Sequence, residues 1–281
     1  MGRIADTWID LGRVLRRRRR NRGEAELRWE YRFEWVRKNA PGRSLIDVGG
    51  LLAKGKLAFA AEDAGASAVT MLDHGDPSLT EFPKLAEERG SKVRTIQGDL
   101  EDPEAIRRAG PHDIVWCTGV IYHTPNPVLQ LMHLREITRE LLYLGTHTIP
   151  EVPGIPQACL FYPYVDEGTR EAVLRGHGDR RGGAGLGQPW EDRPMWGQAN
   201  FWWGLTPSAV RAMLRAARFE IVEEAPIAEY PFMMDVVARP VEKAPLLPPV
   251  SYFREWGEAL ERGEDRPPFD DFYETTGRGY L

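Results

Sequence analysis

The sequence predicts an α/β protein built on a doubly wound, mostly parallel sheet of seven strands. Between about residues 44 and 239, short apolar segments alternate with longer segments of helical spacing. Such alternation requires parallel strands with helices on both faces of one sheet. The last two strand-like segments have no helix between them, so they should pair antiparallel at the sheet edge.

Local patterns place each element in turn. Pro41-Gly42 marks a turn before the first strand, and Thr206-Pro207 is a favourable start for a late helix. The expected strands are Ser44–Val48, Ala68–Leu72, Lys92–Ile96, Asp113–Cys117, Glu140–Thr146, Phe219–Glu223 and Phe232–Ala238. The expected helices are Lys56–Ala64, Leu79–Arg89, Pro103–Ala109, Pro127–Arg139 and Ser208–Ala217.

Residues 148–205 interrupt this alternation with proline, glycine and aromatic residues. Because long irregular segments in compact domains are usually functional, we expect this insert to form a lid over the substrate that accepts the transferred group. Its glycine-rich part, Gly176–Gly187, either covers an anionic acceptor or is a plain surface loop; nearby cations are Arg175, Arg180 and Arg181. Four aromatic residues of the insert belong either to the core or to the floor of an acceptor pocket: Trp196, Phe201, Trp202 and Trp203.

The length of 281 residues suits one large domain with additions. We expect an N-terminal helical segment at 1–40, a sheet domain at 41–240 and a C-terminal extension at 241–281 that is helical around Tyr252–Arg262. No apolar run approaches the roughly 20 residues of a membrane span, and no signal-peptide core is seen. The two cysteines have no partners at metal-ligand spacing, so we expect neither disulfide nor metal, and a cytoplasmic location.

A dense cationic run lies near the N-terminus, at Arg13, Arg16–Arg20 and Arg22. Leu11, Val14 and Leu15 interleave with it at helical spacing. The run is either a solvated helix face or an arm that binds RNA or another polyanion. The net charge of −5 argues against nucleic-acid binding by bulk charge alone.

Three carboxylates lie in register at the carboxyl ends of the first three strands. Asp47 precedes Gly49-Gly50 and Gly55, Asp73 ends the second strand, and Asp99 follows the third. Open α/β sheets bind ligands at the carboxyl ends of their strands, where an acidic residue can hold ribose hydroxyls. Glycine and aspartate are also turn formers, so a purely structural origin is the alternative.

The charge of Asp47 indicates which nucleoside binds. This carboxylate stands two residues before the first glycine and would repel a pyrophosphate. It suits a cofactor with an α-amino group and a sulfonium. The sequence therefore favours S-adenosylmethionine, and places NAD second.

The order strand, Asp-x-Gly, helix, strand, Asp, strand, Gly-Asp, with a closing antiparallel hairpin, resembles class I S-adenosylmethionine-dependent methyltransferases over about residues 40–240. The segment Gly119–Pro127, Thr146-His147 and Trp202-Trp203 are similar to a subgroup that includes wobble-uridine tRNA-modifying enzymes and sugar or natural-product methyltransferases of bacterial gene clusters.

The resemblance implies a Rossmann-like methyltransferase sheet and a set of cofactor contacts. It implies that Asp47, Gly49 and Gly55 flank the methionine end, Asp73 the ribose, and Asp99 with Leu100 the adenine. Further cofactor contacts are expected at Gly50, Cys117 and Gly119. The glycine loop is longer by two residues than the usual Asp-x-Gly-x-Gly-x-Gly.

An oxygen acceptor must lose a proton during methyl transfer, and histidine suits that task. His147 is the expected general base, with His123 and Tyr122 shaping the pocket. Each histidine could instead be structural, as we expect for His133 in its helix. The leading hypothesis is a methyltransferase for a small molecule or glycan in a bacterial biosynthetic pathway. A tRNA wobble-uridine modifying enzyme, a non-catalytic cofactor-binding protein and a nicotinamide-dependent reductase follow in that order.

Overall fold

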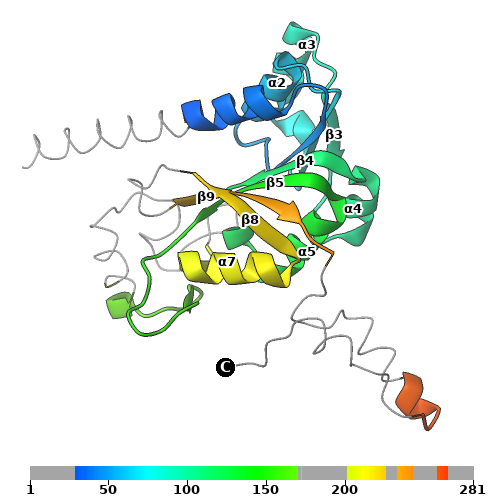
Figure 1. The fold of residues 1–281 in the computed structure, drawn as a ribbon. Helices are drawn as coiled ribbons and strands as arrows, with labels where there is room; N and C mark the ends of the chain where they lie inside the picture. The colour runs from blue at the N-terminus through cyan, green and yellow to red at the C-terminus, as the bar shows by residue number, and fades with distance from the viewer. Residues whose placement is uncertain (1–28, 170–171, 173–200, 226–232, 243–257, 265–281) are drawn as a thin grey trace, which may run out of the picture.

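The computed structural model describes residues 29–169, 172, 201–225, 233–242 and 258–264 (Figure 1). The arginine run, the Gly176–Gly187 loop with its arginines, and Trp196 lie outside these residues. Of the expected C-terminal helix, only residues 258–264 are described, and 258–261 of these are helical. No helix in the described part of the chain is long and apolar enough to cross a membrane.

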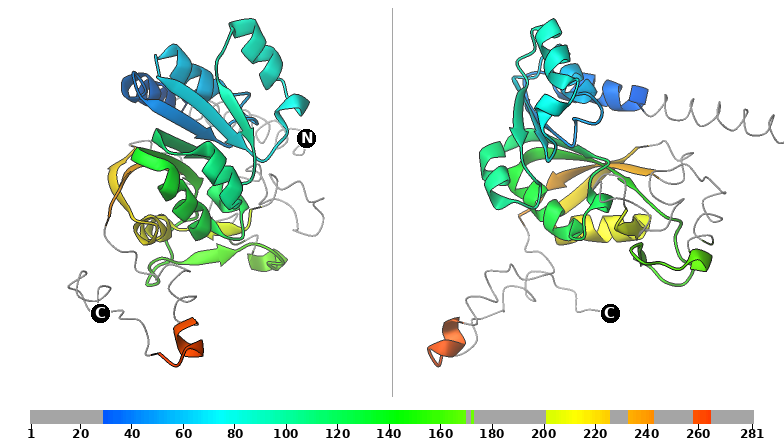
Figure 2. Two further views of the ribbon diagram at one scale, coloured as in Figure 1. Left: turned by 90° about the vertical axis from the view of Figure 1, so that its right-hand side faces the viewer. Right: turned by 180° about the vertical axis from the view of Figure 1, so that it is seen from behind.

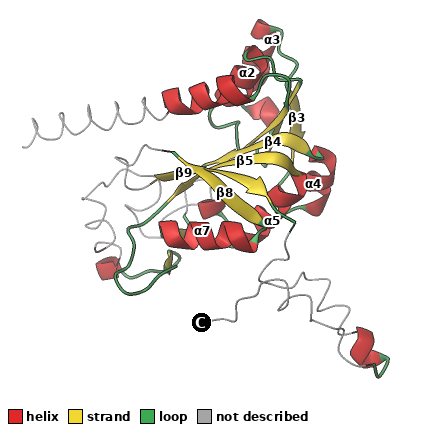
Figure 3. Ribbon diagram, viewed as in Figure 1, coloured by secondary structure: helices red, strands yellow, loops and turns green. Residues whose placement is uncertain are grey.

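A seven-stranded sheet forms the centre of the molecule, in the order β3-β2-β1-β4-β5-β9-β8 (Figure 3). Strands β1 to β5 run parallel, while β9 pairs antiparallel with both β5 and β8. The bounds are β1 Ser44–Val48, β2 Ala68–Asp73, β3 Arg94–Gln97, β4 His112–Thr118, β5 Thr138–His147, β8 Phe219–Glu224 and β9 Met233–Pro240. The predicted fold class and the closing hairpin are confirmed, with β9 inserted between β5 and the edge strand β8.

The helices are α2 Lys56–Asp63, α3 Phe82–Arg89, α4 Pro103–Ala109, α5 Pro127–Ile137 and α7 Pro207–Ala216, with two 3-10 turns, η1 Pro77–Leu79 and η2 Ile121–His123. The helix expected over Leu79–Arg89 starts at Phe82 instead. Pro83, in its first turn, is tolerated there because that position needs no backbone N–H. In α7, Thr206 caps the helix by accepting a hydrogen bond from the Ala209 N–H, as its sequence predicts.

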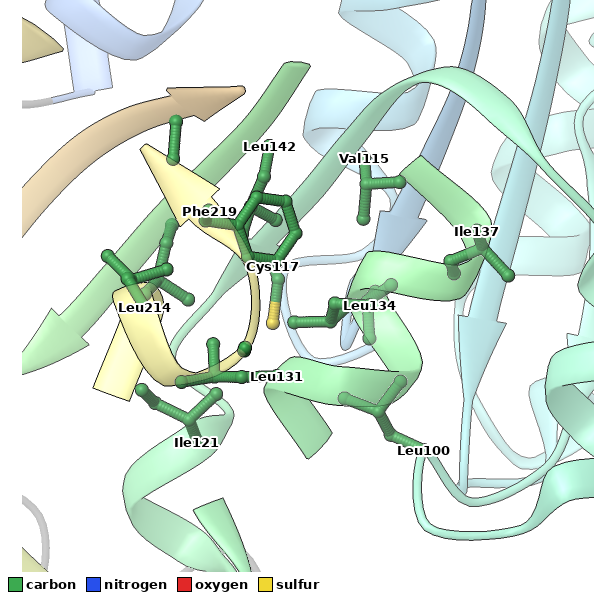
Figure 4. Close-up of a cluster of buried hydrophobic side chains, with 14 of the residues drawn as sticks. Leu100, Val115, Cys117, Ile121, Leu131, Leu134, Ile137, Leu142, Leu214 and Phe219 are labelled. Atoms are coloured by element: carbon green, nitrogen blue, oxygen red, sulfur yellow. The ribbon is translucent and has the colours of Figure 1, made fainter. Parts of the chain in front are cut away.

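Helices cover both faces of the sheet (Figure 2). On one face, α4, α5 and α7 pack over a core that includes Val115, Cys117 and Leu134 (Figure 4). On the other, α2 and the helix at residues 29–39 pack over Trp116 and Tyr143. Neighbouring residues of one strand thus enter different cores, as the two-residue repeat of a strand requires. The helix at 29–39 belongs to the sheet core, because Trp35 and Val36 are buried in it.

The described ends of the insert contain two short strands that the sequence did not predict. These are β6 Cys159–Phe161 and β7 Trp203–Leu205, which pair antiparallel. Strands of three residues are too short to show a periodicity, and this explains the omission. The pair brings the end of the insert back to the η2 loop, where the Trp202 N–H donates to the Tyr122 carbonyl at 2.8 Å.

Candidate active site

A pocket of about 610 Å³ opens at the carboxyl ends of β1 to β4. Open parallel sheets bind their ligands at this place, because the strand order reverses between β1 and β4. Most of the predicted site residues line it: Asp47, Gly49, Gly50, Asp73, Asp99, Leu100, Gly119, Tyr122 and His123. The predicted residues that do not line it are Gly55, Cys117 and His147.

Two buried carboxylates from adjacent strands line the pocket. Asp47 on β1 is 4% exposed, and Asp73 on the adjacent strand β2 is 6% exposed. Burial, and then the charge of Asp73, raise the pKa of Asp47 to about 7; a hydrogen bond from the Ala58 backbone opposes this. Near neutral pH, Asp47 therefore binds a proton readily and would gain from a cationic ligand.

The lengthened glycine loop is tied to Asp73. The Leu51 N–H donates to Asp73 Oδ2 at 3.0 Å, and the Gly75 N–H donates to Oδ1 at 2.9 Å. A Cβ on Gly50 would lie 2.3 Å from Asp47 Oδ2, so only glycine lets the loop pass the carboxylate. Gly55 was predicted to contact the cofactor, but it is the left-handed N-cap of α2, where an added Cβ would lie 2.5 Å from the ring of Phe82.

The loops after β3 and β4 form the opposite wall. Asp99 Oδ1 accepts a hydrogen bond from the Glu101 N–H at 2.7 Å, and the Leu100 carbonyl contacts His133 Nδ1 at 2.7 Å. His133 is thus a buried structural residue, as predicted. Cys117 was predicted to contact the cofactor, but its side chain points into the core between β4 and α5 (Figure 4). Its neighbour Thr118 lines the pocket instead.

Four rings gather beyond the β4 loop. The ring of Tyr122 lies 4.2 Å from that of His123, 4.5 Å from Phe201 and 5.8 Å from His147, between centroids. Tyr122 and His123 line the pocket, but His147 does not. Strand β5 continues one residue further than predicted, so His147 pairs with Met233 in the sheet, and its ring packs 4.8 Å from Phe201.

The aromatic residues of the insert take different positions. Phe201 is buried with Tyr122 and Tyr162, and Trp203 donates its ring N–H to the Pro125 carbonyl at 3.2 Å. Neither residue, nor Trp202, lines the pocket. These aromatic residues pack the end of the insert against the η2 loop.

The pocket lining also includes residues that the sequence analysis missed, among them Trp29, Arg32, Gln130 and Met233. Trp29 and Arg32 come from the helix at 29–39, and Gln130 comes from α5. A helical pattern in the sequence does not identify which polar residue faces a ligand pocket. That direction depends on how each helix packs against the sheet.

No protein-family profile matches the sequence. Two curated proteins are similar to part of it, the ubiquinone biosynthesis O-methyltransferases of Vibrio parahaemolyticus serotype O3:K6 and Vibrio campbellii. They are 37% identical over 87 and 90 residues, which is 31% of this chain. The match covers only 35% of the length of each relative.

Solved structures share the fold over a longer stretch. Magnesium protoporphyrin IX methyltransferase from Synechocystis PCC 6803, with bound S-adenosylhomocysteine, has a TM-score of 0.51 at 18% identity, covering 78% of this chain and 85% of that one. The N-terminal domain of EvdMO1, in the presence of S-adenosylhomocysteine and D-fucose, has a TM-score of 0.50 at 17% identity, covering 74% and 82%. The fold is that of the Rossmann-like methyltransferases, as the sequence predicts.

Proposed function

We propose that this protein binds S-adenosylmethionine and transfers its methyl group to an oxygen of a small molecule. The observation that carries this proposal is the pair of buried carboxylates, Asp47 and Asp73, at the strand ends of one pocket. The partial similarity to O-methyltransferases of ubiquinone biosynthesis supports the same reaction class.

The residues of the pocket fit the chemical groups of this cofactor. Asp47 would hold the α-amino group, since a buried carboxylate with a raised pKa gains most from a cation. Each oxygen of Asp73 accepts one backbone N–H and keeps a lone pair for a ribose hydroxyl. Asp99 and Leu100 line the pocket and would contact the adenine. The bound cofactor would supply a methyl group on a sulfonium, whose sulfur leaves as a neutral thioether.

A histidine of the ring cluster would accept the proton of the acceptor hydroxyl. His123 is the stronger candidate, because it lines the pocket and is partly exposed. His147, first expected in this role, is 7% exposed and outside the pocket lining; it remains the second candidate. Tyr122, which lines the pocket and whose ring packs near both histidines, would orient the acceptor.

Titration calorimetry with S-adenosylhomocysteine tests the proposal. The wild type should bind, and Asp73→Ala should weaken binding by about 1.5–3 kcal/mol, the cost of removing hydrogen bonds to a charged group. Asp76→Ala is the matched control, because Asp76 caps η1 and does not line the pocket. Tighter binding of NADH than of S-adenosylhomocysteine would show that the cofactor assignment is wrong.

Modification of the tRNA wobble uridine is the second candidate, favoured by the run Arg13, Arg16–Arg20 and Arg22. Binding of tRNA should then weaken with salt, and deleting residues 1–22 should flatten that dependence. If the intact protein binds no tRNA, this candidate is removed. A non-catalytic role would leave cofactor binding intact with no turnover on any acceptor. The glycan acceptor, the cytoplasmic location and the domain limits at 41 and 240 stay predictions.

A further inference from the structure

Gln130 is a buried amide in the wall of the pocket, and its side-chain oxygen is left unsatisfied by the described residues. Its side chain lies on α5, is 6% exposed and lines the pocket. Its Oε1 atom is buried and has no hydrogen-bond partner among the described residues. An unsatisfied buried polar group costs about 1–3 kcal/mol of stability. Gln130 therefore destabilises the fold unless a ligand supplies the missing hydrogen bond.

The contacts of α5 show which end of the pocket Gln130 serves. One turn further along the helix, His133 contacts the carbonyl of Leu100, and Leu100 packs with Leu131 and Leu134 in one core cluster (Figure 4). Just before the helix, Asn126 donates to Glu101 at 2.8 Å. Gln130 therefore faces the segment after β3, away from Asp47 at the end of β1.

We propose that Gln130 is a specificity-determining residue that recognises the adenine of the cofactor. This inference rests on the proposed function. An amide offers one acceptor and one donor side by side, and adenine offers the complementary pair on the edge formed by its exocyclic amine and N7. A 6-oxopurine presents two acceptors on that edge, so the amide satisfies only one of them. Gln130 thus selects a 6-aminopurine over its deaminated form.

Calorimetry with two ligands tests the selection: S-adenosylhomocysteine and S-inosylhomocysteine, which differ only in the amino or oxo group. The wild type should bind the amino ligand at least tenfold more tightly. Gln130→Met keeps the length and packing of the side chain without its polar atoms. This variant should lose affinity for the amino ligand about five- to thirtyfold, the loss expected for one or two hydrogen bonds, and most of the discrimination.

Gln97→Met is the matched control, because Gln97 is exposed and outside the pocket lining; it should keep wild-type discrimination. A second readout separates recognition from structural support. Without ligand, Gln130→Met should melt at the wild-type temperature or above it, since it removes an unsatisfied buried group. A lower melting temperature with unchanged discrimination would assign Gln130 a structural role and overturn the inference.

The outcomes distinguish this inference from the proposed function. If the wild type binds S-adenosylhomocysteine and Gln130→Met discriminates as well as the wild type does, only the role of Gln130 is wrong. If the wild type binds neither ligand, the proposed cofactor itself is wrong, and the role of Gln130 falls with it.

Discussion

Arg32 and Asp235 form a buried two-bond ion pair that joins the helix at 29–39 to strand β9 beside the pocket. Arg32 Nε lies 2.8 Å from Oδ2 and Nη2 lies 2.9 Å from Oδ1. The hydroxyl of Tyr143 also donates to Oδ2, at 2.9 Å. Burial and the charge of Asp235 raise the pKa of Tyr143, so its hydroxyl stays protonated and remains a donor. The helix that carries Trp29 and Arg32 to the pocket is held by this network.

Replacing Asp235 should destabilise the protein strongly. Asp235→Asn leaves the Arg32 charge buried without its counter-ion, and the expected loss in the free energy of unfolding is about 3–5 kcal/mol. Chemical denaturation measures this loss. Glu220→Gln breaks the exposed pair of Arg239 and Glu220 and should cost at most about 1 kcal/mol. Equal losses in the two variants would contradict the stabilising role of the buried pair.

The raised pKa of Asp47 predicts that cofactor affinity depends on pH. Below pH 7 the carboxyl binds a proton and loses its attraction for the ligand ammonium, so S-adenosylhomocysteine should bind more weakly at pH 6 than at pH 8, by up to about tenfold per unit below the pKa. Binding at pH 7 should release protons, which calorimetry in buffers of different ionisation enthalpy detects. Proton release that persists in Asp47→Asn would assign the effect to another group.

The same shift predicts a cost to stability. The pKa of Asp47 is about 7 in the folded state and about 3.9 in an unfolded chain, so the folded state binds more protons between these values. The contribution of Asp47 to stability is therefore greatest below about pH 4 and falls as pH rises to about 7. Asp47→Asn without ligand should be more stable than the wild type at pH 8, by up to about 4 kcal/mol. A less stable variant would show that Asp47 supports the fold as a carboxylate.

A methyl group at Gly50 should disturb the cofactor site directly. In Gly50→Ala the added Cβ would meet Asp47 Oδ2 at 2.3 Å and Met71 Sδ at 2.9 Å, so the carboxylate must move. We expect affinity for S-adenosylhomocysteine to fall at least about tenfold, or about 1.4 kcal/mol. In Gly75→Ala the nearest contact would be 3.3 Å, and the loss should be smaller. Unchanged affinity in Gly50→Ala would mean that the loop adapts freely.

The two histidines of the ring cluster can be separated by kinetics. If His123 is the general base, His123→Ala and His123→Gln should lower turnover by about 10²- to 10⁴-fold, with nearly unchanged affinity for S-adenosylhomocysteine. His147→Ala should have a much smaller effect, since His147 does not line the pocket. A large loss confined to His147→Ala would restore the original assignment.

The sequence by itself determined the fold class and the positions of the three carboxylates at the strand ends. Both follow from local order along the chain: strands alternate with helices, Asp47 and Asp73 lie at the carboxyl ends of β1 and β2, and Asp99 lies just after β3. In a parallel sheet the carboxyl ends of strands lie at one edge, so residues far apart in the chain are brought together by the topology alone.

Only the tertiary structure decided which other side chains reach the pocket. Arg32 and Gln130 lie on helices whose faces are fixed by packing against the sheet, and His147 is withdrawn because β5 continues through it. Cys117 turns into the core because alternate residues of β4 face opposite sides. A helix pattern or a strand end predicted to within a residue or two cannot fix these directions, since a shift of one residue reverses the face of a strand.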